Sequence, residues 1–321
     1  MSSAPLASVI IICFNQEAYI EQALLSVINQ KTTFPFEIIV GNDASTDSTG
    51  QIIEEVNQQY PGRLSILPSE TNLGPVANEY RCFLSAKGEY VAFLEGDDYW
   101  VGTERLQKQV SYMEMHKDCG LVHGDVHHYK VTEKTWIKNY NQHTKGKELV
   151  DDYSLANLLV CQKHFVKTMT CCFRKSIIEK NRVYENAIDK EWLLTDLAIW
   201  YELCQHSTCH YFDEVFAVYR LQKNSVSRSS SAKRVHQFHL SVYDIRYFYW
   251  QKYLNSPDLK RIIDQQMAYM LLGDAYNAKS SDIAKRARNA IKQSEVRLNS
   301  KQGILYFLSH FFWLWPSQDK T

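Results

Sequence analysis

The sequence has 321 residues, more than one compact domain usually needs, so we expect a core domain with a C-terminal extension. Hydrophobic residues make up 45% and charged residues 22% of the chain, as in ordinary globular proteins. The formal net charge is zero, which argues against a nucleic-acid partner.

The first third of the chain alternates between strand and helix patterns. Residues 8–13 form a continuous, mostly β-branched run, typical of a strand buried on both faces. Residues 16–29 then carry apolar residues at helical spacing. Strands that alternate with helices predict βαβ units, and hence a parallel sheet with helices on both faces. The further elements expected here are strands at 36–40, 64–67 and 90–94 and helices at 47–60 and 76–86.

The remainder of the chain is less regular. Strands are expected at 120–126 and 215–221, a helix at 196–204, and a loop rich in Ser, Lys and Asn at 222–233. The chain beyond that loop has the pattern of helices only. We therefore predict two regions with different architectures. Residues 1–230 form an α/β domain with a Rossmann-like, mostly parallel mixed sheet flanked by helices, and residues 231–321 form a helical C-terminal region.

Polar residues follow the carboxyl ends of the expected parallel strands, which is the edge where ligands bind in open α/β sheets. Phe14-Asn15 follows the first strand, Asp43 the second, Asn72-Leu73-Gly74 the third and Glu95-Gly96-Asp97-Asp98 the fourth. Asp43 could accept hydrogen bonds from a base or ribose. The alternative is a turn residue or a helix N-cap. Three other polar strand ends beside Asp43 favour the ligand.

The acidic segment after the fourth strand gives the sharper signal. Glu95, Asp97 and Asp98 fall within four residues, and carboxylates this close repel one another unless a cation compensates. Such oxygen ligands suit Mg²⁺ or Mn²⁺, which one or two carboxylates and substrate phosphates often hold. Gly96 lets the backbone approach a ligand closely. A solvated turn would also tolerate acids, but the apolar residues on both sides favour a metal site.

In these ordered motifs the chain resembles glycosyltransferase family 2, the inverting enzymes of the GT-A fold, over residues 8–227. Residues 8–15 are similar to the family's opening strand, and residues 38–47 to its second strand and base-binding turn. The acidic segment stands where the family has its Asp-x-Asp element. The resemblance implies that Asp43 contacts the base and that Asp97, with or without Asp98, meets the metal and diphosphate. The candidate donor-binding residues are Ile12, Phe14, Asn15, Asp43, Asn72, Gly74, Glu95, Gly96, Asp97 and Arg220, and the candidate metal ligands are Asp97 and Asp98.

The resemblance also indicates a catalytic base. Family members carry a Glu-Asp or Thr-Asp pair at the start of a helix below the acceptor site, and Thr195-Asp196 opens an apolar run here. One carboxylate would deprotonate the acceptor hydroxyl while that oxygen attacks the anomeric carbon. The alternative is an ordinary helix start, with Thr195 as N-cap and Asp196 as a first-turn acid favoured by the helix dipole. The upstream motifs favour Asp196 as base.

Several positions depart from the family pattern. Gln222 stands where many members have a His, which puts a third protein ligand to the metal in doubt. Arg220 or Lys223 could neutralise charge on the leaving diphosphate, and the alternative is that both lie in a solvated loop. Glu95 replaces the more usual Asp. Glu79-Tyr80 stands where many members have an Arg-Asn pair, so one expected donor contact is missing.

The C-terminal tail combines basic and apolar segments. Residues 279–301 are rich in Lys and Arg, and residues 304–315 are apolar and aromatic. The apolar run is too short to span a bilayer, but it suits an interfacial helix on an anionic membrane surface. The alternatives are a helix packed onto the catalytic domain or onto a partner in a homodimer. The eight scattered cysteines contain no Cys-x-x-Cys pair, and no targeting segment is visible, so we expect a cytoplasmic protein, with or without peripheral contact with the inner face of the cell membrane.

Together these observations predict a metal-dependent inverting hexosyltransferase. The donor would be a nucleotide-diphosphate sugar, UDP-linked by family analogy. The acceptor would be a saccharide, lipid-linked, in capsule, O-antigen or other surface-polysaccharide synthesis. A sugar nucleotidyltransferase would need a Gly-rich, basic loop after the first strand, and residues 13–17 are nothing like one. The remaining alternative is a nucleotide-sugar-binding or scaffold protein of the same fold without turnover.

Overall fold

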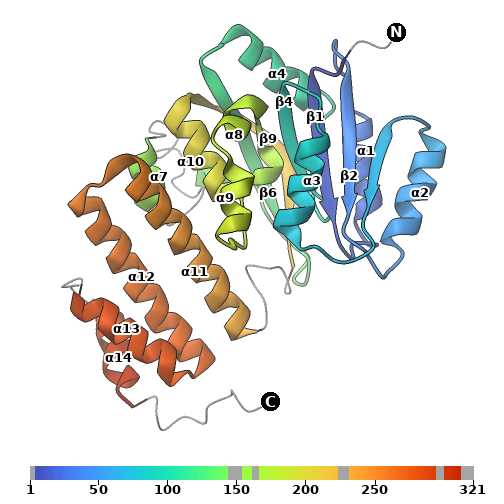
Figure 1. Cartoon of the computed structure of the whole chain (residues 1–321). Helices are drawn as coiled ribbons and strands as arrows, with labels where there is room; N and C mark the ends of the chain where they lie inside the picture. Colours follow the sequence, from blue (N-terminus) through green and yellow to red (C-terminus); the bar gives the residue numbers. More distant parts are fainter. Residues whose placement is uncertain (1–3, 144–153, 161–165, 223–230, 294–299, 312–321) are drawn as a thin grey trace. The chain divides into compact units, whose positions relative to one another are not determined.

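The computed structural model describes residues 4–143, 154–160, 166–222, 231–293 and 300–311 (Figure 1). The chain divides into two compact units. The first unit comprises residues 1–158 and 162–221, and the second comprises residues 159–161 and 222–321. The first unit contains the sheet and the second is helical, so each has its own architecture.

Nine strands in the described part of the chain form one sheet. They are β1 (Ala7–Cys13), β2 (Phe36–Asn42), β3 (Leu64–Pro68), β4 (Tyr90–Glu95), β5 (Tyr99–Trp100), β6 (Cys119–Lys130), β7 (Thr135–Ile137), β8 (Cys172–Arg174) and β9 (Thr208–Leu221). Their order is β3-β2-β1-β4-β8-β6-β9-β5, and β7 pairs with β6. β1 pairs in parallel with both β2 and β4, whereas β8 is antiparallel to both β4 and β6. This mixed sheet with flanking helices confirms the predicted fold class.

Helices cover both faces of the sheet in the first unit (Figure 1). The helical segments before residue 207 are α1 (Ile20–Ile28), α2 (Thr49–Gln59), α3 (Pro75–Ser85), α4 (Arg105–Met115), α5 (Tyr140–His143), α7 (Leu155–Val160), the 3₁₀ turn η1 (Thr168–Thr170), α8 (Lys175–Lys180), α9 (Val183–Asp189) and α10 (Asp196–His206). Val9 and Ile11 of β1 pack in one core with α1, α2 and α4. On the opposite face α3 lies so close to β2 that a Cβ at Gly41 would overlap the Sγ of Cys82. Both faces are therefore covered, as the unbroken apolar run of β1 predicts.

The strands and helices of the first third lie where the sequence predicts them, with one difference. The helix expected from residue 16 begins at Ile20, because Gln16 and Glu17 bind the neighbouring loop instead. The backbone N–H of Gln16 donates to Thr49 Oγ1 at 2.7 Å, and that of Glu17 to Asp47 at 3.1 Å. The strands expected at 120–126 and 215–221 are longer, because β6 and β9 pair with each other in parallel along most of their lengths.

Helices make up the described part of the second unit, as the sequence predicts. They are α11 (Ala232–Tyr249), the π-helical turn η3 (Trp250–Leu254), α12 (Pro257–Ala278), α13 (Ser281–Gln293) and α14 (Ser300–Ser309). Ser231 and Ser256 cap α11 and α12 by accepting backbone N–H groups of the first turns. Leu271 and Leu272 of α12 pack against Ala287 of α13 in a separate small core. Within the described residues no helix has the length and apolarity needed to cross a membrane.

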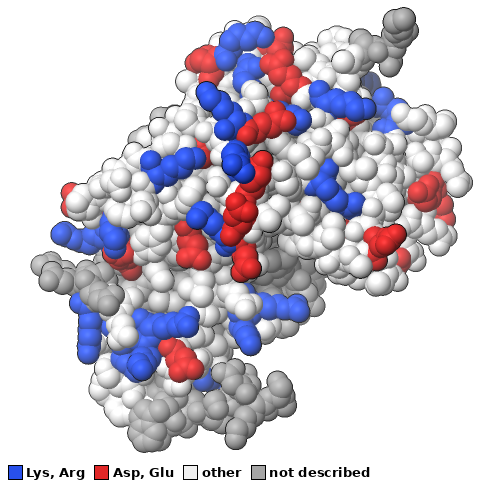
Figure 2. All heavy atoms as spheres, viewed as in Figure 1, with Lys and Arg blue, Asp and Glu red and all other residues white. Residues whose placement is uncertain are grey.

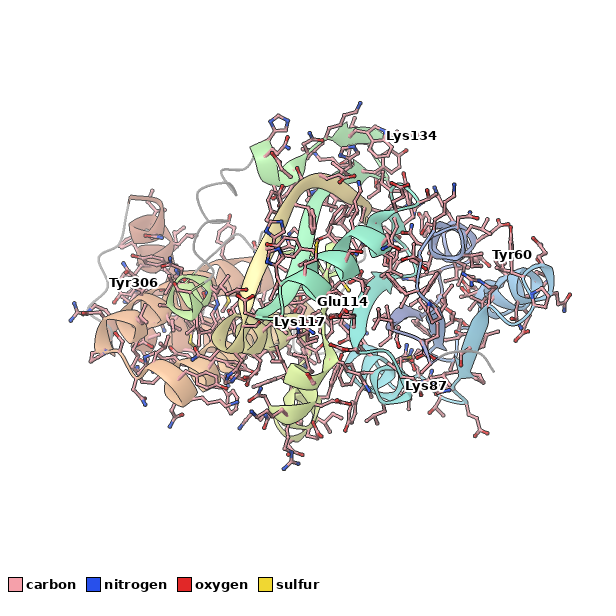
Figure 3. All side chains as sticks on the ribbon, turned by 90° about the horizontal axis from the view of Figure 1, so that it is seen from above. Tyr60, Lys87, Glu114, Lys117, Lys134 and Tyr306 are labelled. Atoms are coloured by element: carbon pink, nitrogen blue, oxygen red, sulfur yellow. The ribbon has the colours of Figure 1, made fainter. Side chains whose placement is uncertain are left out.

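Arg105 of α4 ties together segments far apart in the chain. Its side chain is buried, and it donates to the carbonyl oxygen of Cys171 at 3.2 Å and to that of Met169. Its guanidinium carbon lies 3.9 Å from the ring centroid of Trp100. Burial lowers the pKa of Arg105 to about 9, so the side chain stays charged at neutral pH. Glu114, near the end of the same helix, pairs at 3.0 Å with Lys117, which lies two residues beyond the helix (Figure 3).

We expect Arg105→Met to lower the free energy of unfolding by roughly 2–4 kcal/mol, because each buried carbonyl left without a donor costs about 1–3 kcal/mol. The matched control is Lys108→Met in the same helix. Lys108 pairs with Glu214 at 2.7 Å, but both side chains are about half exposed, so its loss should cost less than about 1 kcal/mol. Thermal and urea unfolding measure both changes. Equal losses in the two variants would contradict a structural role specific to Arg105.

Candidate active site

The ends of β1, β2 and β4 lie side by side at one edge of the sheet. The register places Ile12 opposite both Gly41 and Glu95. Pairing continues past the strands, since the N–H of Asp43 donates to Cys13 at 3.0 Å and that of Gly96 donates to Ile12 at 2.9 Å. The loops that follow these strands therefore start from a common, fixed line.

Asn15 links the first loop to the second. Its backbone is left-handed, with φ of 53°, a conformation that Asn tolerates better than most residues. Its N–H donates to Ser45 Oγ at 3.0 Å, and its side-chain oxygen accepts the N–H of Thr46 at 2.8 Å. Phe14, just before it, leaves 44% of its surface exposed. The loop thus holds an exposed aromatic ring at the edge of the sheet.

Asp43 holds the third loop against the second strand. Its two carboxylate oxygens accept the N–H groups of Leu73 at 2.8 Å and Gly74 at 2.9 Å. The Asn72 side-chain amide donates to the Asp43 carbonyl at 3.2 Å. The structure therefore brings Asp43, Asn72 and Gly74 together as the sequence predicts. Only 3% of the Asp43 surface is exposed, and its contact with a base remains a prediction.

The acidic segment after β4 contains two carboxylates with unsatisfied oxygens. Asp98 is fully buried, and its Oδ1 accepts the backbone N–H of Arg220 at 2.7 Å. Its Oδ2 and the Oε2 of Glu95 are buried and accept no hydrogen bond from any described residue. Burial first, and then the charge of Asp97, raises the pKa of Glu95 to about 8 and that of Asp98 well above its ordinary value. A Cβ at Gly96 would overlap Gln16 Oε1 and would lie 2.8 Å from Cys13 Cβ, so a larger residue there would force neighbouring atoms to shift.

Arg220 fastens β9 to this segment. Its side chain donates to the carbonyl oxygen of Asp97 at 2.6 Å and also to Gln22. Its guanidinium lies between the rings of Tyr19 and Tyr99, with centroids at 4.9 and 4.7 Å. Arg220 is buried at the end of a strand, so a solvated loop does not describe it. Lys223, the other cation considered for the diphosphate, lies outside the described residues.

The donor set fits a divalent cation that takes part of its coordination from a ligand. Among the described residues, no group of three or more His, Cys, Asp or Glu side chains is placed to hold a metal ion alone. Asp97 is partly buried and lies in the sequence between Glu95 and Asp98, whose carboxylates each have one buried, unsatisfied oxygen. Mg²⁺ is commonly held in this way, by one or two carboxylates together with substrate phosphates.

Asp196 begins α10 and lies within electrostatic reach of the acidic segment. After burial and Asp97, the charges of Glu79 and Asp196 also raise the pKa of Glu95. Asp196 accepts the N–H of Leu197 at 2.7 Å, and burial raises its own pKa against the opposing charge of Lys167. A carboxylate whose proton affinity is raised in this way is better suited to remove a proton near neutral pH.

Glu79 is a site residue that the sequence did not identify as functional. Its Oε1 accepts the hydroxyl of Thr195 at 2.6 Å and that of Tyr184 at 2.7 Å. Burial raises the pKa of Glu79 to about 7. The signal available in the sequence was the replacement of an Arg-Asn pair by Glu79-Tyr80, which we interpreted only as a missing donor contact. Tyr80 stacks on the same Tyr184 ring, with centroids 5.1 Å apart.

Comparison with known proteins gives a family match. The sequence model of the family described as "Glycosyl transferase family 2" matches residues 8–182, more than half of the chain. An uncharacterized protein of Mycobacterium tuberculosis is 43% identical over 111 residues, which are 35% of this chain and 32% of that protein. The chain thus spans about a third of the length of this relative. The GalNAc(5)-diNAcBac-PP-undecaprenol beta-1,3-glucosyltransferase of Campylobacter jejuni is 25% identical over 95% of this chain and 93% of its own length.

Solved structures with the same fold include S. aureus TarS in complex with UDP-GlcNAc. It has a TM-score of 0.62 and 19% sequence identity, and the match covers 96% of this chain and 87% of that chain. The mannosyltransferase PcManGT from Pyrobaculum calidifontis, in complex with GDP-Man and Mn²⁺, has a TM-score of 0.52 and 16% identity over 98% of this chain and 82% of its own. At these identities the likeness shows the GT-A fold alone.

The unsatisfied carboxylates predict an unusual pH dependence of stability. The folded protein holds the proton of Glu95 up to about pH 8, whereas the ordinary pKa is 4.5. Binding of this proton stabilises the folded state. The contribution is complete below pH 4.5, falls as the pH rises above that value, and is lost once the pH has passed 8. We expect Glu95→Gln to gain thermal stability relative to the wild type across this range, without added divalent cation. The control is Glu54→Gln on the exposed face of α2. If the thermal stability of Glu95→Gln changed with pH in the same way as that of the wild type, the expectation would be contradicted.

Proposed function

Because the chain belongs to glycosyl transferase family 2, we propose that it transfers a sugar from a nucleotide-diphosphate sugar to a hydroxyl group of a saccharide, with inversion at the anomeric carbon. We assign the transfer to residues 1–230. The observation that carries the proposal is that a carboxylate outside the acidic segment acts on it electrostatically. The acidic segment at Glu95–Asp98 follows β4, and the charge of Asp196, which begins α10, raises the pKa of Glu95.

In this reaction the donor's base and ribose lie at the loops of Asp43, Asn72 and Gly74, with Ile12, Phe14 and Asn15 beside them. Asp196 removes the proton of the acceptor hydroxyl as that oxygen forms its bond to the anomeric carbon. The bond from that carbon to the diphosphate oxygen breaks on the opposite side, and the diphosphate leaves with the bonding electrons. One displacement of this kind inverts the anomeric configuration.

Asp97, with or without Asp98, would hold a divalent cation, Mn²⁺ or Mg²⁺, together with the donor's phosphate oxygens. Such a cation, when bound, neutralises charge that develops on the leaving diphosphate. Glu95 and Gly96 shape the backbone beside it. The Arg220 side chain donates a hydrogen bond to the carbonyl oxygen of Asp97 and so holds the backbone of the acidic segment. This contact favours a positioning role for Arg220 over direct contact with the diphosphate.

The relatives support a narrower substrate class. The Campylobacter relative is named as a glucosyltransferase acting on an undecaprenol-diphosphate-linked glycan, and TarS was solved with UDP-GlcNAc. We therefore propose a UDP-hexose donor and a lipid-linked oligosaccharide acceptor in surface-polysaccharide synthesis. A GDP-sugar, as in the mannosyltransferase structure, is the alternative donor to include in an assay.

We expect Asp196→Asn to lower kcat by about 10²–10⁴-fold, because the amide cannot take the acceptor proton. Binding of the nucleotide sugar, measured by calorimetry, should remain.

Asp97→Ala should instead lose metal-dependent nucleotide binding, with a loss of activity on the order of 100-fold or more. The assay supplies UDP- and GDP-sugars, Mn²⁺ or Mg²⁺, and lipid-linked saccharide acceptors.

The control for both variants is Asp189→Asn, an exposed acid at the end of α9. Full activity of either site variant would refute the role given to that residue. Metal-dependent binding of nucleotide sugars by the wild type without turnover, over a broad acceptor panel, would instead support a binding or scaffold protein.

For the second unit we propose peripheral contact with an anionic membrane. α13 carries Lys285, Arg286, Arg288 and Lys292, and Figure 2 shows basic side chains gathered over this helix. Ile304 and Phe307 of α14 are 61% and 63% exposed, and Leu308 and Phe311 extend the same apolar stripe. An exposed apolar stripe near a basic helix matches the chemistry of an anionic lipid surface. The apolar run continues to residue 315, and its residues from 312 lie outside the described part.

We expect removal of the chain from Gly303 onward to abolish sedimentation with vesicles that contain anionic lipid. The double substitution Ile304→Ser with Phe307→Ser keeps the length and should weaken binding in the same direction. Vesicles of neutral lipid are the control, because the basic helix contributes only at an anionic surface. Unchanged sedimentation with anionic vesicles after the truncation would contradict this proposal, and a change from dimer to monomer would point to a homodimer contact instead.

A further inference from the structure

We propose that Glu79 is a positioning residue for Asp196, which holds the first turn of α10 through Thr195 and adds a titratable charge beside the base. This inference rests on the proposed function, because it concerns the base of that reaction. It assigns a role to the Glu-Tyr pair that stands where the family pattern has Arg-Asn.

The first observation is the diverted hydroxyl of Thr195. Thr195 occupies the N-cap position of α10, where a Thr side chain ordinarily accepts a backbone N–H of the first turn. Here its side chain makes no such bond, and its hydroxyl donates to Glu79 at 2.6 Å. A missing cap costs a helix about 1 kcal/mol. The start of α10 is therefore held from α3, and the residue after Thr195 is Asp196.

The second observation is the packing that fixes Glu79 itself. The hydroxyl of Tyr184, from α9, donates to the same carboxylate oxygen at 2.7 Å. The Tyr184 ring is fully buried, stacks on Tyr80 and contacts Phe83 with centroids 4.8 Å apart. Glu79 and Tyr80 thus bind one aromatic residue, from its hydroxyl and from its face. The carboxyl group has little freedom, and so Thr195 has little freedom too.

The third observation is the charge around Glu79. Burial raises the pKa of Glu79 to about 7 against the lowering effect of the hydrogen bonds from Thr195 and Tyr184, and the charge of Asp196 adds to the rise. An electrostatic interaction between two carboxylates is reciprocal. The charges of Glu79 and Asp196 both raise the pKa of Glu95 of β4, and the charge of Lys167 lowers that of Asp196. Cys82, on the same helix as Glu79, has a pKa of about 12 and stays a thiol.

The charge has a consequence for the base. As pH rises through about 7, Glu79 ionises next to Asp196. A neighbouring negative charge raises the proton affinity of a carboxylate, so Asp196 becomes a stronger base. The kcat/KM of the wild type should therefore rise across this pH range by more than the pH dependence of the acceptor hydroxyl itself accounts for.

The test measures kcat and KM from pH 6 to pH 8 for the wild type, Glu79→Ala, Glu79→Gln and Thr195→Val. Glu79→Ala loses both the anchor and the charge, and we expect kcat to fall about 10- to 100-fold with little change in donor KM. Thr195→Val removes the same hydrogen bond. The variant that combines Glu79→Ala with Thr195→Val should therefore have a kcat only slightly lower than that of Glu79→Ala alone. Glu79→Gln keeps an acceptor oxygen and should recover much of the kcat lost in Glu79→Ala.

The pH profile separates this role from a merely structural one. Gln cannot ionise, so the ratio of Glu79→Gln to wild-type kcat/KM should fall by about threefold or more between pH 6 and pH 8. Glu54→Gln is the matched control on an exposed helix face. Full kcat in Glu79→Ala, or a ratio for Glu79→Gln that does not change with pH, would overturn the inference. Absence of turnover by the wild type would count against the proposed function instead.

Discussion

The parallel pairing of β1 with β2 on one side and β4 on the other is the constraint on which the site depends. It places Ile12 opposite Gly41 and Glu95, so three chain segments reach the same edge together. The backbone bonds of Asp43 to Cys13 and of Gly96 to Ile12 then carry this alignment into the loops. Asn15, Asp43 and the acidic segment have fixed positions because the strands before them do.

Much of this first third could be predicted from the sequence, because its signals are local. The apolar runs of β1 and β4 are buried on both faces, and a strand of that kind needs covered neighbours. Polar residues at the ends of such strands must meet at one edge. The resemblance to the glycosyltransferase family rested on the same residues, and the family match over residues 8–182 confirms it.

The contacts that the sequence did not predict are those between distant segments. Arg105 is an ordinary helix residue in its local pattern, and only the packed structure shows it bound to the carbonyl oxygens of Met169 and Cys171. Arg220 is similar, since its bond to the Asp97 carbonyl joins positions 123 residues apart. Glu79 looked like a lost contact because its partners, Tyr184 and Thr195, come from helices that no local pattern places beside it.

The bond between Glu79 and Thr195 also bears on how the chain folds. It joins positions 116 residues apart, and a contact of such separation must offset the entropy of closing a long loop. The start of α10 lacks a side-chain cap from Thr195, so its final position depends on α3 and α9 being docked already. A nascent or partly folded chain would thus hold Asp196 loosely, and the capacity to transfer a sugar would arise only once the whole first unit is assembled. Activity would then mark the completion of folding in this unit.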